Sequence, residues 1–437
     1  MFIDKVMTRI WAPITEEYRR SYNEAKKLSA EELYERHTTT KMKYFPYIGV
    51  NMNYIDTLGC PYRMRGGKLS GCSMCDYQSE HATRQGSLLA LREKDPVLYA
   101  KAVRVGFQNS RGEDASGNVI ENVSGYDSLN HDEVPEELCD ELFRKDLFKD
   151  TPFIYNIEAR ASTIDEKRLM EFKNTVANKK RVSIDFGVEV SSDWLRNQWL
   201  NKDVSNQQII NAVKLLHEYD FRAVGNVLLG LPGLTEEQMI EEFVNTVVWM
   251  DRIGIDKIVI HGLNRKKYTL QGYLYQKLVN DEELMECGLA QGEHTGIPWL
   301  FTMIRGLYEV YKTDPNLYKK TVMVRLDVNF NSITNQISYN HLNSTQCNQK
   351  YIDYVNGLAI NKEYFSLPGM VKKMKKDPDY HHYTELLTKQ KNCGDLASTI
   401  RLVAKKVAQS LEGDKWEELY SELIIPEELK NNKRGSI

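Results

Sequence analysis

The sequence predicts an α/β protein built on a partial, six-unit (β/α) barrel of the TIM type, with an α-rich C-terminal extension. Short β-type runs alternate with longer helical runs over residues 46–262, and the pattern becomes mainly helical after residue 262. Each β-type run is followed by enough residues for the crossover that parallel strands require. The two further units of a closed eight-stranded barrel are not evident, so we expect an open barrel.

The chain divides into three predicted parts. Residues 1–45 form a helical N-terminal extension, residues 46–262 the barrel, and residues 263–437 a mainly helical domain that covers the barrel and defines the substrate. The six expected strands are Tyr47–Asn53, Val103–Gln108, Phe153–Ile157, Val182–Val188, Ala223–Leu229 and Lys257–His261. Capping-box spacing marks helix starts at Thr163, Ser205 and Thr235, and a hairpin is expected from Thr321–Asn329 and Ser332–Tyr339.

Composition excludes several classes of protein. The 437 residues include 58 Lys and Arg against 61 Asp and Glu, so the formal charge of −3 does not by itself indicate a nucleic-acid partner. No run approaches the ~18–20 apolar residues that span a bilayer, and Met1–Pro13 lacks the apolar core of a secretory signal. We therefore expect a cytoplasmic protein with no membrane partner. The lysine-rich run Lys372–Lys376 is expected to be a solvated helix face.

Three of the seven cysteines, Cys60, Cys72 and Cys75, fall in one glycine-rich loop after the first expected strand. Three thiolates at this spacing favour a metal site. A closed zinc site in a non-enzymatic binding protein is one alternative, but it needs a fourth ligand, and no second Cys-x-x-Cys or His pair lies near. A four-iron cluster held by three thiolates would leave one iron open for catalysis.

The loop resembles that of the radical S-adenosylmethionine enzymes, in particular the branch related to elongator protein 3. The shared features are the Cys60-Pro start and the Cys72-Ser-Met74-Cys75 end, although the eleven-residue gap between Cys60 and Cys72 is longer than the commonest spacing of three. The run from Gly71 to Tyr77 is also similar to the cluster loop of the radical enzymes of archaeosine formation in tRNA.

This resemblance implies a 4Fe-4S cluster that cleaves S-adenosyl-L-methionine reductively to a 5′-deoxyadenosyl radical, which abstracts hydrogen from a substrate. The electron would come from a reductase, a flavodoxin or a ferredoxin. The substrate expected on these grounds is a tRNA base or its precursor. The alternative substrate is a small molecule or a peptide. The alternative reaction cleaves S-adenosyl-L-methionine to a 3-amino-3-carboxypropyl radical.

The resemblance also implies roles for individual residues. Cys60, Cys72 and Cys75 would bind the cluster and act in catalysis. Glu189 stands where the related enzymes have Gln, and could bind the ribose hydroxyls or the ammonium group of the cofactor. The full set of expected cofactor-binding residues is Met74, Tyr77, Gln108, Glu158, Glu189, Asn226 and Gly230.

Four other residues are expected to be structural. His261 ends the sixth expected strand and is more often a packed histidine than a catalytic one. Cys287, Cys347 and Cys393 are expected to be buried free thiols, although a hydrogen-donor role stays open.

Overall fold

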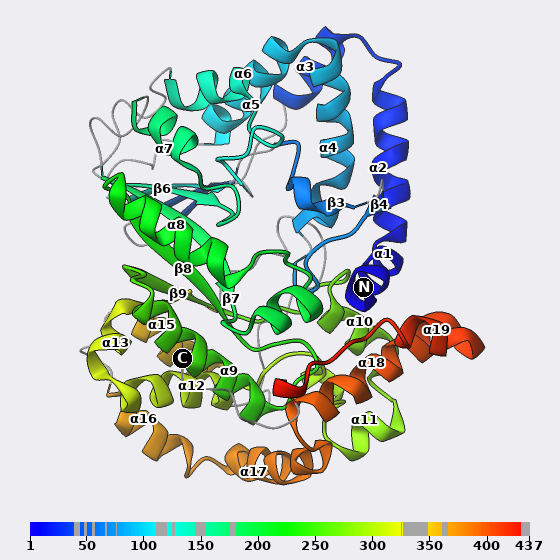
Figure 1. Cartoon of the computed structure of the whole chain (residues 1–437), viewed down its shortest axis with the longest axis vertical. Coiled ribbons are helices and arrows are strands. Elements are labelled where there is room, and N and C mark those ends of the chain that lie inside the picture. Colours follow the sequence, from blue (N-terminus) through cyan, green and yellow to red (C-terminus); the bar gives the residue numbers. More distant parts are fainter. Residues whose placement is uncertain are drawn as a thin grey trace.

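The computed structural model describes residues 1–38, 44–47, 50–54, 57–65, 68–75, 77–110, 120–124, 127–144, 154–174, 181–324, 326, 348–360 and 366–429. It contains an eight-stranded sheet whose spatial order follows the chain (Figure 1). The strands are β1 (Tyr44–Tyr47), β2 (Val50–Tyr54), β5 (Ile120–Ser124), β6 (Ile154–Ala159), β7 (Arg181–Glu189), β8 (Arg222–Leu229), β9 (Lys257–Gly262) and β10 (Thr321–Met323).

The strand directions confirm the predicted fold class. The first strand, β1, pairs antiparallel with β2, and all pairs from β2 to β10 are parallel. Strands added in chain order, each after a crossover, are the arrangement of a (β/α) barrel. Two parallel strands, β5 and β10, were not among the six expected. The strand β10 joins the sheet from beyond residue 262, so the division of the chain at that residue stays a prediction.

The prediction of a strand over Val103–Gln108 is wrong. These residues lie in helix α5 (Pro96–Ser110), and β5 supplies the strand between β2 and β6. Tyr99 and Val103 are both fully buried, and a spacing of four residues places them on one face of a helix. The β-branched residues of this run therefore reflect packing against neighbouring helices and not pairing in a sheet.

Helices cover the sheet and form the two ends of the molecule. Those before β9 are α1 (Phe2–Ile10), α2 (Ala12–Ala25), α3 (Ala30–Thr38), α4 (Tyr77–Lys94), α5, α6 (Glu136–Cys139), α7 (Glu166–Phe172), α8 (Asn206–Glu218) and α9 (Glu236–Arg252). Those after β9 are α10 (Leu270–Leu278), α11 (Glu282–Glu286), α12 (Leu300–Thr313), α13 (Pro315–Lys320), α15 (Asn348–Ile360), α16 (Leu367–Met374), α17 (Pro378–Gln390), α18 (Leu396–Glu412) and α19 (Trp416–Tyr420).

Two of the three predicted capping boxes are present. Ser205 and Thr235 accept from the backbone N–H groups of Gln208 and Gln238, whose side chains bond back to the cap residues. The third predicted box, at Thr163, is not formed. Helix α7 begins after Asp165, whose side chain accepts from the Arg168 N–H group. Thr163 instead donates its hydroxyl to Asp127, at 2.7 Å.

The C-terminal part is mainly helical, as predicted. The expected hairpin is not formed at its start, because Thr321–Met323 pairs parallel with β9, and residues 327–347 lie outside the described residues. At the end of α16, Lys372 and Lys373 are exposed while Val371 and Met374 are buried, which is the solvated helix face expected. Among the described residues, each helix is too short or too polar to serve as a transmembrane span.

The apolar core has two parts. One lies between the sheet and the helices that follow its strands, and includes Ile184, Phe186 and Ile260. The other joins the two ends of the chain, since α1 packs on α10, α18 and α19 (Figure 1). The first helix therefore belongs to the same packed body as the C-terminal helices.

Candidate functional site

The cysteine loop follows β2 and contains a small hairpin. Cys60 precedes a 3₁₀ turn over Pro61–Arg63, and then β3 (Met64–Arg65) pairs antiparallel with β4 (Lys68–Leu69). The Ser70 N–H group closes this excursion by donating to the Arg63 carbonyl, at 2.7 Å. The long gap between Cys60 and Cys72 is thus a folded hairpin that returns the chain to its starting point.

The second half of the loop is bonded to the segments that follow β7 and β9. Ser73, fully buried, donates its N–H group to the Leu200 carbonyl at 2.9 Å and its hydroxyl to the Trp199 carbonyl at 2.8 Å. Its own carbonyl accepts from the Leu270 N–H group at 2.7 Å. The Asn201 amide donates to the Gly71 carbonyl at 2.9 Å. The loop therefore lies over the carboxyl ends of the strands, where barrel enzymes place their sites.

The N-terminal helices hold the loop from the other side. The Ser70 hydroxyl donates to the Asp4 carboxylate at 2.8 Å, and the Trp11 indole donates to the Tyr268 carbonyl at 2.9 Å. Gly71 lies against the Trp11 ring, where an added Cβ would come within 2.6 Å of a ring carbon. Glycine is required here because backbone and ring approach closely.

The electrostatics of the thiols are set by burial and by Arg160. Burial raises the pKa of Cys60 to about 12; Arg160 opposes this rise, and Glu133 and Cys72 add to it. Burial disfavours the charge of Arg160, but Cys60 and Cys72 raise the pKa of its guanidinium above the usual value. The guanidinium also stacks on Tyr62, 3.4 Å from the ring centroid. A buried thiol of this kind stays protonated until a metal displaces its proton.

Arg160 connects the cysteine loop to Glu189. Its guanidinium, close to Cys60 and Cys72, donates to the backbone carbonyl of Lys202. The Lys202 ammonium in turn bonds to the Glu189 carboxylate at 2.7 Å, and both side chains are only 10% exposed. Glu189, which the sequence predicts to bind the cofactor, is thus connected to Cys60 and Cys72 through Lys202 and Arg160.

The donor set suits a cluster, but its ligation stays a prediction. Three thiols of one loop are the ligands that an iron–sulfur cluster prefers, and the Cys60 and Cys72 thiols interact with each other and with one cation. Within the described parts of the chain, no three Cys, His, Asp or Glu side chains are already grouped closely enough to hold a metal ion.

Polar side chains share one face of the sheet. The register pairs Glu158 with Asp185, Gly187 with Asn226, and Leu228 with His261, so all of these residues lie on the same face. The opposite face, with Ile184 among others, is buried and apolar. Polar residues gathered at the carboxyl ends of parallel strands are typical of a binding site. Glu189 departs from this register, because it pairs with Val227, but its carboxylate lies beside Gly187 on this face. The structure thus brings three predicted residues, Glu158, Glu189 and Asn226, to one surface.

Glu189 ends β7 in an unusual conformation. Its φ is +64°, in the left-handed region that non-glycine residues rarely adopt, and the register shifts between Gly187 and Glu189. Such an irregularity turns the side chain away from the regular strand direction. An added Cβ on Gly187 would collide with the Glu189 and Lys202 side chains. Gly187 thus leaves the room that this ion pair occupies.

Asp185 forms a second polar group that sequence reasoning missed. Burial raises its pKa to about 7, against weaker opposing effects of Asn156 and Lys257. One carboxylate oxygen accepts from Asn156 at 3.4 Å, and Asn226 also bonds to the carboxylate. The other oxygen, Oδ1, is buried and has no hydrogen-bond partner among the residues that the structure describes. The signal in the sequence that marks this face was the recurrence of Ser183, Asp185 and Glu189 at alternate positions, with Gly187 between them.

His261 belongs to this same polar group. Its Nε2 lies 3.2 Å from the Asn226 side-chain oxygen, and burial lowers its pKa below the usual value, with Glu189 opposing. The neutral imidazole is thereby favoured at neutral pH. The structural role expected for His261 is supported by this contact, although Glu189 is near enough to act on the pKa of the imidazole.

The remaining predicted residues are more scattered. Gly230 follows β8 with φ +113°, and an added Cβ would meet Leu263 and Pro298, so a glycine is required there for packing. Met74 is half-buried, and its carbonyl accepts from the Gln271 amide at 3.2 Å. Tyr77 begins α4, and its side chain lies outside the described residues. Gln108 was expected at the end of a strand, and that prediction is wrong. It lies exposed on helix α5.

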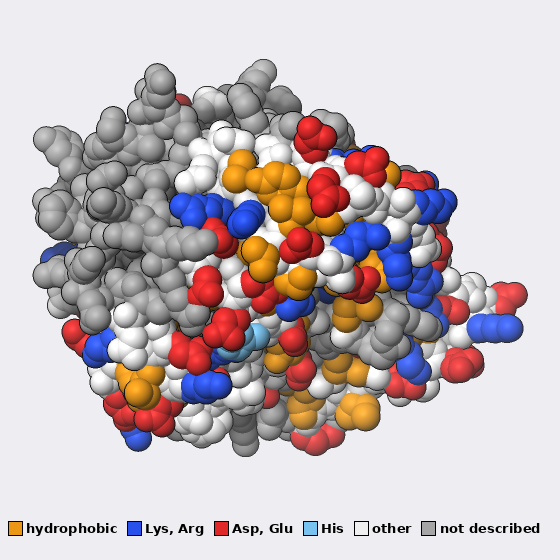
Figure 2. Space-filling view, turned by 90° about the horizontal axis from the view of Figure 1, so that it is seen from above, with side chains coloured by type: hydrophobic (Ala, Val, Ile, Leu, Met, Phe, Trp, Pro, Cys, Tyr) orange, Lys and Arg blue, Asp and Glu red, His pale blue; other side chains and the backbone are white. Residues whose placement is uncertain are grey.

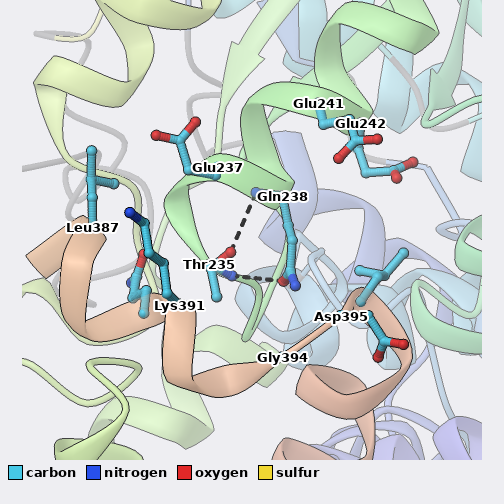
Figure 3. A pocket seen from close by; sticks show the side chains of 11 residues that line it. Thr235, Glu237, Gln238, Glu241, Glu242, Leu387, Lys391, Gly394 and Asp395 are labelled. Carbon is cyan, nitrogen blue, oxygen red and sulfur yellow. Dashed lines mark hydrogen bonds between the residues drawn. The ribbon is translucent and has the colours of Figure 1, made fainter. Parts of the chain in front are cut away.

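A cavity of about 180 Å³ lies apart from the cysteine loop (Figure 3). It is bounded by the start of α9, including Glu237 and Gln238, and by the turn between α17 and α18, including Lys391 and Asp395. None of the predicted site residues lines it. Four of its eleven lining residues are acidic, and none of the polar-face residues described above lines it.

Comparison with known sequences finds distant relatives. No protein-family model matches the chain. The chain is 25% identical over 255 residues to the archaeosine synthase subunit beta of Methanosarcina acetivorans, which covers 58% of this chain and 65% of that protein. It is 23% identical over 259 residues to an uncharacterized protein of Methanocaldococcus jannaschii, covering 59% and 64%. The chain thus matches slightly less than two thirds of each relative. The first match confirms the resemblance predicted from the cysteine loop.

Solved structures show a weaker likeness. The Elp3 protein of Methanocaldococcus infernus aligns with a TM-score of 0.39 and 13% identity, over 61% of this chain and 59% of that chain. The coproporphyrinogen III oxidase of Escherichia coli, described as a radical SAM enzyme, aligns with a TM-score of 0.28 and 16% identity, over 44% and 41%. Scores below 0.5 do not establish a common fold.

Proposed function

We propose that this chain is a radical S-adenosylmethionine enzyme in which Cys60, Cys72 and Cys75 bind a 4Fe-4S cluster. The observation that carries the proposal is the series of contacts from the thiols through Arg160 and Lys202 to Glu189. It joins a three-cysteine loop to a polar sheet face at the carboxyl ends of parallel strands. The sequence match to an archaeosine synthase subunit supports it.

The chemistry supplied by such a cluster, when bound, is one electron for reductive cleavage of S-adenosylmethionine. The protein residues bind and orient the reactants. Arg160 would stabilise the negative charge of the thiolates, and the Glu189–Lys202 pair offers an acceptor and a donor for the polar end of the cofactor. The hairpin and the N-terminal helices cover the loop and would exclude water.

Metal content and cofactor cleavage test this proposal. After anaerobic reconstitution with iron and sulfide, the reduced protein should give an electron paramagnetic resonance signal that changes on addition of S-adenosylmethionine. Cys72→Ala should lose the signal, and Cys139→Ala, a half-buried cysteine on α6, should retain it. Chromatography should detect 5′-deoxyadenosine, whereas methylthioadenosine would indicate the alternative 3-amino-3-carboxypropyl route. One zinc per chain with intact S-adenosylmethionine would contradict the proposal and favour the zinc-stabilised binding protein.

For the substrate, we propose a tRNA base or its precursor. The support is the match to a protein named for archaeosine synthesis. Figure 2 shows acidic and basic side chains interspersed over the described part of one face, without a continuous basic area there. Binding of bulk tRNA should therefore be measured by filter retention over a salt series. Affinity that does not fall as salt rises would contradict contact with the phosphate backbone and favour a small molecule or peptide.

A further inference from the structure

Two cysteines outside the cluster loop meet in the C-terminal part. Cys287 directly follows α11, and Cys393 ends the turn that follows α17, more than one hundred residues later. Both are buried, with exposed fractions of 7% and 5%. The Cys393 thiol donates to the Cys287 carbonyl at 3.1 Å. The Cys287 thiol donates to the Leu284 carbonyl at 3.6 Å. The two side chains are near enough for Cys393 to lower the pKa of Cys287, and for Cys287 together with burial to raise the pKa of Cys393.

The segments that carry these cysteines are held together by neighbouring contacts. Gln390, three residues before Cys393, donates to the Gly288 carbonyl at 3.0 Å and accepts from the Glu236 N–H group at 2.9 Å. Gly288 directly follows Cys287, and an added Cβ there would lie 2.9 Å from a Leu386 methyl group. The two cysteines therefore lie together at a packed junction of the segment after α11, the end of α17 and the start of α9.

We propose that Cys287 and Cys393 are a reversible disulfide site that responds to a peroxide. The Cys287 thiolate attacks one peroxide oxygen, forming a sulfenic acid and releasing water after protonation. The Cys393 thiol then attacks the sulfenic sulfur, forming the S–S bond and releasing a second water. Each thiol loses one proton and one electron, and the peroxide takes up both electrons. A dithiol reductant reverses the reaction by thiol–disulfide exchange.

The bond would link the helices on one side of the cavity. Lys391 and Gly394, which come before and after Cys393 in the chain, line the cavity opposite the start of α9 (Figure 3). A covalent link from Cys393 to α11 would hold this wall in place. It would also restrain the unfolded chain over the residues between the two cysteines, so the oxidised protein should unfold at a higher temperature.

Peptide mapping tests the proposal on the full chain. After graded hydrogen peroxide, alkylation and non-reducing trypsin digestion, wild type should give a linked pair of the peptides 278–305 and 392–401, about 2 Da lighter than the sum of the two thiol peptides. Met285, 45% exposed on the first peptide, reports the dose through its sulfoxide. Cys287→Ser and Cys393→Ser should each lose the linked peptide, and Cys139→Ser should keep it.

Thermal unfolding provides the second measurement. Oxidation should raise the unfolding midpoint of wild type and Cys139→Ser, and dithiothreitol should reverse the shift. Neither Cys287→Ser nor Cys393→Ser should show the shift. If both thiols stay open to alkylation at a dose that converts Met285, or if Cys287 proceeds to a sulfinic acid without pairing, the proposal is wrong.

Discussion

Asp185 shows how a single buried carboxyl group makes stability depend on pH. Burial raises its folded-state pKa to about 7, above the ~3.9 of an unfolded chain. The native state therefore binds a proton more readily than the unfolded state, and this group lowers stability as pH rises from about 4 to about 7. Glu236 behaves alike, because burial also raises its pKa to about 7.

Asp185→Asn removes this ionisation. We expect the variant to match wild type near pH 4 and to exceed its free energy of unfolding by about 1–4 kcal/mol at pH 8. Urea unfolding at both pH values measures the difference, and the contribution of Glu236 cancels because both proteins retain it. Exposed Asp132→Asn is the control and should change neither value. Equal differences at the two pH values would show that ionisation of Asp185 is not the cause.

The Glu189–Lys202 pair gives a second prediction. Lys202→Met leaves a buried carboxylate without its cation, and should lower the free energy of unfolding by about 3–5 kcal/mol at neutral pH. Adding Glu189→Gln to that variant should recover part of the loss. Lys214→Met, which breaks an exposed pair with Glu218, should cost less than about 0.5 kcal/mol. Similar losses in Lys202→Met and Lys214→Met would contradict the role assigned to burial.

The cysteine loop shows what a supersecondary element requires of its neighbours. Its first half folds on itself as the β3–β4 hairpin, while its second half depends on the Trp199–Asn201 segment, on Leu270 and on Trp11. The spacing of the cysteines predicted a metal loop but not the hairpin, because each of its strands has only two residues. Strand pairing this short leaves no hydrophobic period in a sequence.

Gly71→Ala tests how tightly this loop is held. The added methyl would press against the Trp11 ring, so we expect a loss of about 1–3 kcal/mol in the free energy of unfolding. Reconstituted iron per chain should fall as well, since the loop carries the proposed ligands. Gly369→Ala on α16 is the matched control, because an added Cβ there meets only the Ser366 side chain, at 3.1 Å. Unchanged stability and iron content in Gly71→Ala would show that the loop tolerates movement of Trp11.

At the scale of the whole molecule, the first and last helices of the described chain pack together. Phe2, Ile3, Val6 and Met7 are buried in the core that also holds α18 (Figure 1). Charged contacts surround this core, including one between Lys5 and Glu422, whose side chains are 45% and 35% exposed. The burial of apolar side chains should contribute more to the free energy of unfolding than such exposed ion pairs do.

Ile3→Ala should therefore lower the free energy of unfolding by about 2–5 kcal/mol, and Lys5→Ala by less than about 1 kcal/mol. Urea denaturation followed by tryptophan fluorescence compares the two, and Trp11 lies close enough to report on the same core. Raising the salt concentration should reduce only the effect of Lys5→Ala, since salt screens exposed charges. A larger loss in Lys5→Ala than in Ile3→Ala would overturn this ranking.

Local patterns in the sequence determined the alternation of strands and helices, the capping boxes at Ser205 and Thr235, and the position of the cysteine loop. These features depend on residues a few positions apart, which act through backbone geometry and short hydrogen bonds. The same local view misplaced a strand at Val103–Gln108, because burial between helices and burial in a sheet select similar residues.

Only the tertiary structure decided which distant groups meet. It brought Arg160 to the thiols of Cys60 and Cys72, Trp11 to Gly71, and Cys393 to Cys287. These pairs are separated by sixty to more than one hundred residues, and no period or spacing in the sequence connects them. Their contact follows from the order of the strands and the packing of the two cores, which are properties of the whole chain.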